Sequence, residues 1–325
     1  MSSPFSLEVS RDESAWDRFI RDSVEGTIFV ESHYLAALES PHVCYFVRKG
    51  QERRGALVVM LNDQGQGVLH DHVIHHGLMF AKEPASRSNA KRLSDRFDIT
   101  EYLAQALPEI YPVITLALPP QVEDMRPYLW HNYGGDEVQR WSLDLRYTSY
   151  LEIDGCGSSD LAQNPLFERL GKSRRQEVRY ARRDAVFAEI LESPEGMLEL
   201  YRLTMEKGGT TVPKAQLQAM LRLMEQLQAA GCGVTYGVRN PQGEVISASY
   251  FCWDNKRAYF LFGGNHPHKK SRYAGTVALW DAFRDLNRRG ITVVDMEGVN
   301  SPWRGWFKLS FGGSLLPYYE VSFGS

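Results

Sequence analysis

One pattern occurs twice in this sequence, and it constrains the fold more than any other feature. Residues 43–49 (VCYFVRK) and residues 234–240 (VTYGVRN) share the pattern V-x-Y-x-V-R-[K/N]. A polar turn follows each copy, and then a second apolar run begins, at Ala56 in one half and at Val245 in the other. Short apolar runs on both sides of a polar turn are typical of a β-hairpin. The sequence therefore predicts the same hairpin in each half.

The segments around the two hairpins repeat in the same order. Two helical patterns precede each hairpin, and a further helical pattern and another strand follow it. These segments are residues 15–23, 32–38, 91–107 and 113–118 in the first half, and residues 197–207, 215–231, 276–290 and 291–298 in the second. The order predicts an α/β (α+β) fold with a mixed, mostly antiparallel sheet and flanking helices in each half. We expect domains 1–155 and 156–325, because a Gly/Ser-rich polar break covers residues 152–160.

Composition narrows the class of protein. Apolar residues make up 43% and charged residues 24% of the chain, which is typical of globular domains. No apolar run approaches the roughly 18–20 residues that a membrane span needs. The four cysteines form no CxxC pair, which favours a reducing compartment and argues against a disulfide or zinc framework. The first twenty residues lack the basic and apolar regions of a signal peptide, so we expect a cytoplasmic protein.

A basic segment lies between the two halves, although the net charge of −3 gives the whole chain no general attraction for nucleic acids. Four cations in it are spaced i, i+3, i+7 and i+10, which places them on one face of a helix: Lys172, Arg175, Arg179 and Arg182. We call these four residues the basic stripe. Two interpretations are open. The stripe is either a solvated face with salt bridges to Glu168, Glu177 and Asp184, or a surface that binds phosphates.

The C-terminal segment DMEGVNSPWRGWFKLSFGG, residues 295–313, differs from ordinary core sequence. It leaves a predicted strand with two acids, Asp295 and Glu297, which period-2 alternation places on the same side. After a Gly/Pro/Trp loop it sets Lys308 among bulky apolar side chains: Trp306, Phe307, Leu309 and Phe311. Either these side chains exclude water from a functional lysine, or Lys308 is a surface lysine on an edge strand.

With these pieces assembled, the chain resembles the Fem family of non-ribosomal peptidyl transferases. Four segments carry the resemblance in order along nearly the whole chain: residues 15–40, 126–145, 170–190 and 295–313. The last is similar to the family signature D-x-x-G…F-K-x-x-F-G and is the most specific. The resemblance implies two tandem GNAT-type acyltransferase domains and an arm-less member, because the helical arm of some relatives has no counterpart here. It also implies that Lys308, in the F-K pair, stabilises the oxyanion formed during acyl transfer.

The two carboxylates have more than one interpretation. At the end of a strand, Asp295 and Glu297 can accept the proton of the attacking amine or orient the amino group. Alternatively, Asp295 caps the turn that Gly298 indicates.

The donor is expected at the loop HPHKKSRYAG, residues 266–275, where a helix begins. Backbone N–H groups at a helix N-terminus, with cations nearby, suit a phosphate. The residues expected at the donor are Lys269, Lys270, Arg272, Gly275 and Phe307. The stretch from Arg272 to Val277 is close to the Q/R-x-x-G-x-G/A loop of CoA-binding GNAT enzymes, but Val277 replaces the small residue. The basic stripe favours aminoacyl-tRNA over acyl-CoA as the co-substrate, and we expect no tightly bound cofactor.

Histidines gather in the first half in the segment GVLHDHVIHHGLMF, residues 67–80. At about 3.3 Å per residue along a strand, His76 would stand too far from His70 to share a metal ion, so no metal site is predicted. In Fem-type proteins the first domain contributes to the acceptor site. We therefore expect the acceptor cleft to include His72, His75, His76 and Trp303.

The sequence leaves three hypotheses for the function. The leading hypothesis is a Fem-like aminoacyltransferase that transfers an aminoacyl group from aminoacyl-tRNA to an amine of a small molecule or cell-wall precursor. The first alternative is an acyl-CoA-dependent N-acyltransferase on the same fold. The second alternative is a non-catalytic double-GNAT protein that binds nucleotide or RNA, against which the intact F-K…F-G motif argues.

Overall fold

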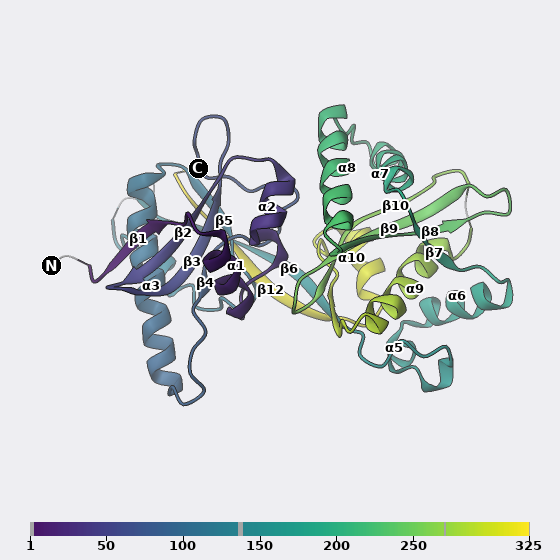
Figure 1. Cartoon of the computed structure of the whole chain (residues 1–325), viewed down its shortest axis with the longest axis horizontal. Helices are drawn as coiled ribbons and strands as arrows, with labels where there is room; N and C mark the ends of the chain where they lie inside the picture. The colour runs from purple at the N-terminus through teal and green to yellow at the C-terminus, as the bar shows by residue number, and fades with distance from the viewer. Residues whose placement is uncertain (1–2, 136–138, 270, 325) are drawn as a thin grey trace. The chain divides into compact units, whose positions relative to one another are not determined.

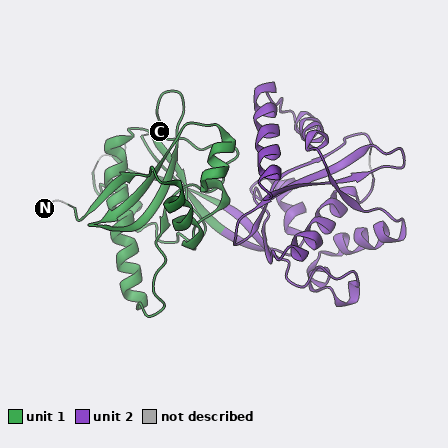
Figure 2. Cartoon of the chain, in the orientation of Figure 1, with its two compact units in different colours: residues 1–146, 317–325 green, residues 147–316 purple. Residues whose placement is uncertain are grey.

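A computed structural model of the chain describes residues 3–135, 139–269 and 271–324. It divides into two compact units (Figures 1 and 2). Unit 1 comprises residues 1–146 and 317–325, and unit 2 comprises residues 147–316.

Unit 1 contains the first predicted hairpin, in which β2 and β3 pair antiparallel from His42↔Met60 to Lys49↔Glu52. Its four-stranded sheet has the order β1-β2-β3-β4. The elements of the first half are β1 (Phe5–Val9), α1 (Glu13–Asp22), η1 (Ile28–Val30), α2 (Ser32–Leu38), β2 (His42–Lys49), β3 (Glu52–Met60), β4 (Met79–Phe80), α3 (Asn89–Ile110), β5 (Ile114–Ala117), α4 (Arg126–Trp130) and β6 (Ser142–Glu152).

Unit 2 contains the second predicted hairpin, β8 and β9, which also pair antiparallel. Its strands follow the order β6-β11-β10-β9-β8-β7. The elements of the second half are η3 (Leu161–Gln163), α5 (Pro165–Arg169), α6 (Lys172–Arg183), β7 (Ala188–Leu191), α7 (Glu195–Lys207), α8 (Lys214–Ala229), β8 (Gly233–Arg239), β9 (Val245–Trp253), β10 (Ala258–Asn265), α9 (Ala274–Arg288), β11 (Val293–Asp295), α10 (Pro302–Leu309) and β12 (Ser314–Phe323).

The predicted repeat is present in the order of the elements. The series β1-α1-α2-β2-β3-β4-α3-β5 in the first half corresponds to β7-α7-α8-β8-β9-β10-α9-β11 in the second. The predicted mixed α/β class with mostly antiparallel pairing is therefore confirmed in both halves. The halves also differ: α5 and α6 precede β7 without a counterpart before β1, and the last strand of each half departs from a simple duplication.

The last strand of each half pairs outside its own half of the repeat. β6, from the first half, pairs antiparallel with β11 through Tyr150, Leu151 and Glu152. β12, from the second half, pairs antiparallel with β5 through residues 320–323. The boundary expected at residue 155 is therefore wrong: the division falls after residue 146, and residues 317–325 belong to unit 1. The Gly/Ser-rich break is a loop inside unit 2, because the strand before it already belongs to that unit.

Helices cover both faces of the sheet in unit 2, with α7 and α8 on one face and α9 on the other (Figure 1). Alternate residues of β8, Val234 and Tyr236, belong to the same core cluster as Trp280 and Phe283 of α9. The alternate, inward-facing side chains of the strand and the apolar face of the helix thus pack in one core. None of the helices in the described ranges combines the length and hydrophobicity that crossing a bilayer requires.

The pairing of β10 with β11 is short, and this positions the candidate site. The two strands run parallel and pair at Ala258↔Val294 and Tyr259↔Asp295. β11 then ends at Asp295, whereas β10 continues to Asn265 after a register shift between Phe260 and Phe262. Backbone leaving the end of β11 is consequently unpaired with β10, and the site forms there.

A close approach between β10 and α7 gives a test of this arrangement. A Cβ atom on Gly264 would lie 2.5 Å from the carbonyl carbon of Leu200 and 2.6 Å from the amide nitrogen of Tyr201. Because both are backbone atoms, Gly264→Ala should force the helix and strand apart and lower the free energy of unfolding by about 1–3 kcal/mol. Urea unfolding followed by circular dichroism measures this change.

Gly196 in α7 is the matched control. A Cβ atom there would meet only Val245 Cγ2, at 3.9 Å. Alanine also favours a helix over glycine by up to about 1 kcal/mol. Gly196→Ala should therefore leave the urea midpoint unchanged or raise it. Equal midpoints for Gly264→Ala and the wild type would contradict the close approach.

Candidate active site

The chain turns sharply after β11, and Asp295 holds the turn. Glu297 has φ +45° and Gly298 has φ +42°, both in the left-handed region that non-glycine residues rarely adopt. The Oδ1 atom of Asp295 accepts the backbone N–H of Glu297 at 3.0 Å and the hydroxyl of Thr148 on β6. Asp295 thus makes the turn-capping contact that was one of its two predicted roles. Glu297 lies beyond the strand, so the expectation that both acids share one strand face is wrong.

Lys308 lies on the helix α10, so its assignment to an edge strand is wrong. Pro302 begins this helix, where a fixed φ suits the first turn. The Nζ atom donates hydrogen bonds to the backbone carbonyls of Met296 at 2.6 Å and Glu297 at 2.9 Å. It also lies 4.8 Å from the centre of the Phe260 ring. An ammonium group has three N–H donors, so one remains that no acceptor in the described part of the chain takes.

Burial dominates the electrostatics of this cluster. It lowers the pKa of Lys308 to about 8, although negative charge at Glu297 and Asp295 opposes the shift. Burial also raises the pKa of Glu297 well above its usual range, and the neighbouring Asp295 adds to this. The pKa of Asp295 is raised as well, mainly by burial, while its hydrogen bond from Thr148 opposes the rise. Near neutral pH the cluster therefore holds a cationic lysine beside carboxyl groups that bind protons unusually strongly.

Two carboxyl oxygens in the cluster have no hydrogen-bond partner among the described residues. They are Oδ2 of Asp295 and Oε1 of Glu297, and both residues are buried. Buried polar atoms without a partner are rare in folded proteins, because each costs free energy. A bound reacting group would supply hydrogen-bond partners for these oxygens and for the available N–H of Lys308.

The aromatic environment of Lys308 differs from the prediction. Trp306 is 75% exposed and does not shield the lysine, and Trp303 is 90% exposed on the outside of α10 rather than in a cleft. On a helix, residues two and five positions before the lysine project away from it, which a strand-based interpretation missed. Phe260 of β10 is the ring beneath the ammonium group. Phe307 is half-buried, with its ring 5.5 Å from that of Phe311.

Sequence reasoning missed three residues of the cluster: Thr148, Phe260 and Arg257. Arg257 is buried, donates to the hydroxyl of Tyr150 and lies 4.6 Å from the centre of that ring. Its positive charge opposes the rise in the pKa of Asp295. All three come from strands or turns distant in sequence, and no local pattern marks them.

The predicted donor loop reaches a cavity of about 300 Å³ at the N-terminus of α9. Its walls include Lys269, Ser271 and Ala274. The ammonium group of Lys269 pairs with Glu244 at 2.6 Å, so this cation is already partly neutralised. Arg272 lies instead over the ring of Tyr180, at 5.6 Å. Lys270 lies outside the described residues.

Gly275 begins the first turn of α9 beside this cavity. A Cβ atom at Gly275 would lie 3.0 Å from Oδ1 of Asn265, which also lines the cavity. The small residue therefore lets the first turn of α9 lie close to the end of β10. The loop, Lys269 and Gly275 are brought together, as expected, whereas Phe307 packs in the Lys308 region.

The basic stripe lies on α6, whose Val178 and Ala181 are buried. The acids expected to neutralise it pair with other arginines: Glu177 with Arg174 at 3.1 Å, and Asp184 with Arg183 at 2.7 Å. No acid of the described residues lies within ion-pair distance of the stripe residues Lys172, Arg175, Arg179 and Arg182. The predicted salt bridges of the stripe are therefore wrong, and its four cations remain available to anions.

The histidines expected at the acceptor cleft are buried in unit 1. His72, His75 and His76 belong to the buried polar residues of the core. The ring of His75 meets that of Tyr318 edge-on at 4.7 Å, and Nδ1 of His76 lies 3.0 Å from the carbonyl oxygen of Val58. Burial lowers the pKa of both His72 and His76 to about 4. The expectation that they line an open cleft is wrong, because the surrounding core covers them.

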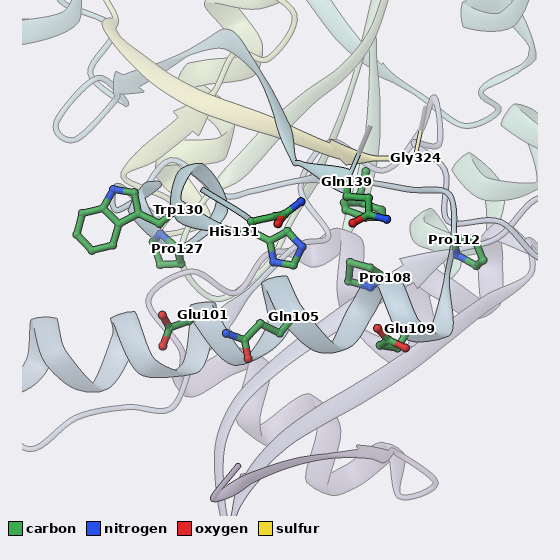
Figure 3. Close-up of a pocket in the computed structure, with 12 residues that line it drawn as sticks. Glu101, Gln105, Pro108, Glu109, Pro112, Pro127, Trp130, His131, Gln139 and Gly324 are labelled. Atoms are coloured by element: carbon green, nitrogen blue, oxygen red, sulfur yellow. The ribbon is translucent and has the colours of Figure 1, made fainter. Parts of the chain in front are cut away.

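A cavity of about 680 Å³ lies in unit 1 (Figure 3). Glu101, Gln105 and Glu109 line it from α3, and Trp130 and His131 line it from α4 and the turn that follows. Lys308, Asp295, Glu297 and the described residues expected at the donor do not line it. Size alone therefore does not mark the candidate active site, which is the buried cluster of unit 2.

Comparisons with known proteins agree with the two-unit architecture. Residues 169–305 match the family model of the acetyltransferase (GNAT) domain. The chain is similar to the crystal structure of FemX, at 13% identity, covering 97% of this chain and 96% of that one, with a TM-score of 0.65. It is also similar to a tandem GNAT protein from the clavulanic acid biosynthesis pathway, at 10% identity, covering 98% and 97% of the two chains, with a TM-score of 0.54.

A third similar structure is the C-terminal domain of a putative lysylphosphatidylglycerol synthetase from Agrobacterium fabrum, at 8% identity. The similarity covers 95% of this chain and 91% of that one, with a TM-score of 0.55. A search of curated protein sequences gave no match. The predicted tandem GNAT fold, similar to that of FemX, is thus confirmed, and residues 169–305 match the acetyltransferase (GNAT) domain model.

The hydrogen bond between Thr148 and Asp295 should contribute measurably to stability. Thr148→Val removes a buried donor to a carboxylate that already has one oxygen without a partner. We expect the free energy of unfolding to fall by about 1–3 kcal/mol, since a buried acceptor loses its partner. Urea unfolding measures the difference.

Thr115→Val is the matched control on β5. The Thr115 hydroxyl bonds only the hydroxyl of Ser322, at 2.9 Å, in a half-buried neutral pair. Its loss should cost less than about 1 kcal/mol, because water can replace the partner. Equal losses in the two variants would argue against a special role for the Asp295 contact.

Proposed function

We propose that this protein is an aminoacyltransferase that forms an amide bond between the aminoacyl group of an aminoacyl-tRNA and an amine of a small molecule or cell-wall precursor. The observation that carries the proposal is the half-buried Lys308 side chain, with one ammonium N–H available, beside the buried carboxyl oxygens of Asp295 and Glu297. Asp295 and Glu297 lie within residues 169–305, which match the acetyltransferase (GNAT) domain, and Lys308 follows three residues after that match. The similarity to FemX and to a domain of a putative lysylphosphatidylglycerol synthetase supports aminoacyl transfer in particular.

The reaction makes one bond and breaks one. The lone pair of the acceptor amine attacks the ester carbonyl carbon, and the carbonyl oxygen becomes an oxyanion. The third N–H of Lys308 donates to that oxyanion, in a region where burial makes the charge interaction stronger than it is in water. The carbon–oxygen ester bond then breaks, the ribose oxygen leaves with a proton, and the nitrogen loses one proton. No oxidant or reductant is needed.

Glu297 is suited to hold the proton that the amine releases. Its pKa is raised well above its usual range by burial, and its Oε1 atom has no hydrogen-bond partner among the described residues. A carboxylate whose pKa is raised by burial is a stronger base than an ordinary one. Asp295 acts as a positioning residue in this scheme, because it holds the Glu297 amide and hence the turn that supplies the carbonyls bound by Lys308.

Two features bear on the identity of the donor. The basic stripe on α6 lacks acidic partners within the described ranges, which suits the repeated phosphates of a tRNA better than a single CoA. The cavity at the N-terminus of α9 suits the phosphate of either donor. That cavity keeps an acyl-CoA-dependent N-acyltransferase as the second candidate. We favour aminoacyl-tRNA because the stripe is an additional anion-binding face.

Lys308→Gln should abolish most of the activity without unfolding the protein. We expect the single-turnover rate of transfer to fall about 100- to 1000-fold, as for the loss of one oxyanion donor. Because the pKa of Lys308 is about 8, the wild-type rate should fall as pH rises above that value and the ammonium group loses its proton. Both expectations are tested by measuring, across pH, the transfer of labelled amino acid from aminoacyl-tRNA to a panel of small amines.

Two variants make that result specific. Lys308→Arg keeps a permanent charge, so its rate should no longer fall through pH 8, even if the rate is lower. Lys214→Gln removes an exposed lysine at the start of α8 and should leave the rate unchanged. A folded Lys308→Gln protein that works at the wild-type rate would rule out the oxyanion role.

The donor is tested by equilibrium binding of labelled tRNA at several salt concentrations, with CoA as competitor. If the stripe binds phosphates, Arg175→Gln with Arg179→Gln should weaken binding. The slope of log K against log salt should also become shallower, by about 0.7–0.9 for each phosphate that the variant no longer neutralises. Arg18→Gln, an exposed arginine of α1, is the charge control. CoA binding that displaces tRNA, or CoA binding without tRNA binding, would favour the acyl-CoA enzyme.

A further inference from the structure

A second cavity in unit 2, of about 300 Å³, lies between β7 and α9. Phe187 and Ile190 line one side and are 56% and 51% exposed. Arg284 and Arg288, one turn apart on α9, line the other side. A pocket with an exposed aromatic ring opposite two guanidinium groups has no part in the acyl-transfer cluster described above. We call it the β7–α9 pocket.

The acids of this pocket already have partners within the protein. Asp281 accepts the amide of Ala188 at 2.9 Å and pairs with Arg284 at 3.3 Å. Asp285 accepts the hydroxyl of Tyr236 at 2.7 Å and a guanidinium N–H of Arg289 at 2.8 Å.

Arg288, in contrast, is an exposed cation without an acid. Its hydrogen bond goes to the carbonyl oxygen of Gly157 at 3.4 Å. No carboxylate in the described ranges lies within ion-pair distance of it. Its charge is consequently available to an anion at the edge of the pocket.

The pocket continues the basic stripe of α6. α6 packs on α9, and Val178 of α6 shares a core cluster with Leu279 and Phe283 of α9. Arg182, the last stripe residue, lies near enough to Arg284 for the two positive charges to interact, and Asp281 and Asp160 partly offset this. A phosphate backbone that follows the stripe would therefore reach the pocket at its Arg182 end.

We infer that the β7–α9 pocket binds one unpaired nucleotide of an RNA whose phosphates lie along the basic stripe. Phe187 offers a ring on which a base can stack, and the exposed Arg288 offers donors to its phosphate. A base inside a duplex is stacked on both faces, so a base that enters the pocket must be unpaired. The volume lies at the lower end of small-molecule sites, which suits one nucleotide. This inference rests on the proposed tRNA donor and adds where its single-stranded part binds.

The same chemistry occurs in the phosphoadenosine of CoA, so the test must separate the two sources. It uses labelled RNA hairpins with the same stem, one blunt and one with a four-nucleotide 3′ overhang, and compares both with CoA. The full chain should bind the overhang hairpin about tenfold or more tightly than the blunt one, because stacking adds to the phosphate contacts. Fluorescence anisotropy at two salt concentrations gives both affinities.

Phe187→Ala should remove the preference for the overhang and leave the blunt hairpin affinity and the salt dependence unchanged. Phe187→Trp keeps a stacking surface and should retain the preference, which separates stacking from a folding defect. Arg288→Gln should weaken overhang binding and reduce its salt dependence. Leu129→Ala, at a side chain of α4 in unit 1 that is similarly exposed, is the matched control for loss of apolar surface.

The outcomes separate this inference from the proposed donor. If Phe187→Ala keeps the overhang preference while the stripe variants lose tRNA binding, the pocket assignment is wrong and the donor proposal stands. If the wild type binds neither hairpin nor tRNA, both are wrong. Binding of CoA that Phe187→Ala weakens, without RNA binding, would assign the pocket to CoA and overturn the RNA assignment.

Discussion

The position of the Lys308 ammonium group is the constraint on which the rest of the site depends. Its two hydrogen bonds go to the carbonyls of Met296 and Glu297, and both point at one place only because the chain passes through the left-handed region there. A side chain at Gly298 would come within 3.4 Å of the ammonium nitrogen, so the turn and the lysine determine each other. Burial of this charge is unfavourable by itself. The carbonyls, the Phe260 ring and the neighbouring carboxyl groups offset that cost.

The exchange of last strands makes this site depend on both halves of the sequence. Thr148, which bonds Asp295, comes from β6, the strand that ends the first half of the repeat. β6 pairs with β11 at Asp295 itself, opposite Tyr150. A simple duplication would place that strand beside β5 and leave the carboxylate of Asp295 without its hydroxyl donor. Unit 2 therefore obtains part of its candidate active site from the sequence of the first half.

Some charged side chains of α6 form ion pairs within the protein, and the basic stripe does not. Glu177 and Asp184 neutralise Arg174 and Arg183, and Arg174 additionally bonds Thr276 on α9 at 2.7 Å. Through Thr276, Arg174 connects α6 to α9. The residues of the basic stripe have no acidic partner in the described ranges and are available to bind anions. The β7–α9 pocket lies at the Arg182 end of the same surface. One helix thus supplies both the packing and the charge that the proposed RNA contact requires.

The sequence by itself determined the repeated order of elements, the hairpins, and the stripe of cations on one helical face. Each of these follows from spacing along the chain, since the periods of strands and helices are local properties. The F-K…F-G motif also marked Lys308 before its surroundings were known. Local sequence pattern was sufficient to predict these features.

Only the tertiary structure decided which strand completes each unit, that Lys308 lies on a helix over Phe260, and that Trp303 and Trp306 face outward. It also decided that the histidines of residues 72–76 are buried and that the acids near the stripe pair with other arginines. Burial, partner choice and pKa depend on groups that approach from distant parts of the chain. No spacing in the sequence records those approaches, which is why the repeat could be predicted and the environment of the site could not.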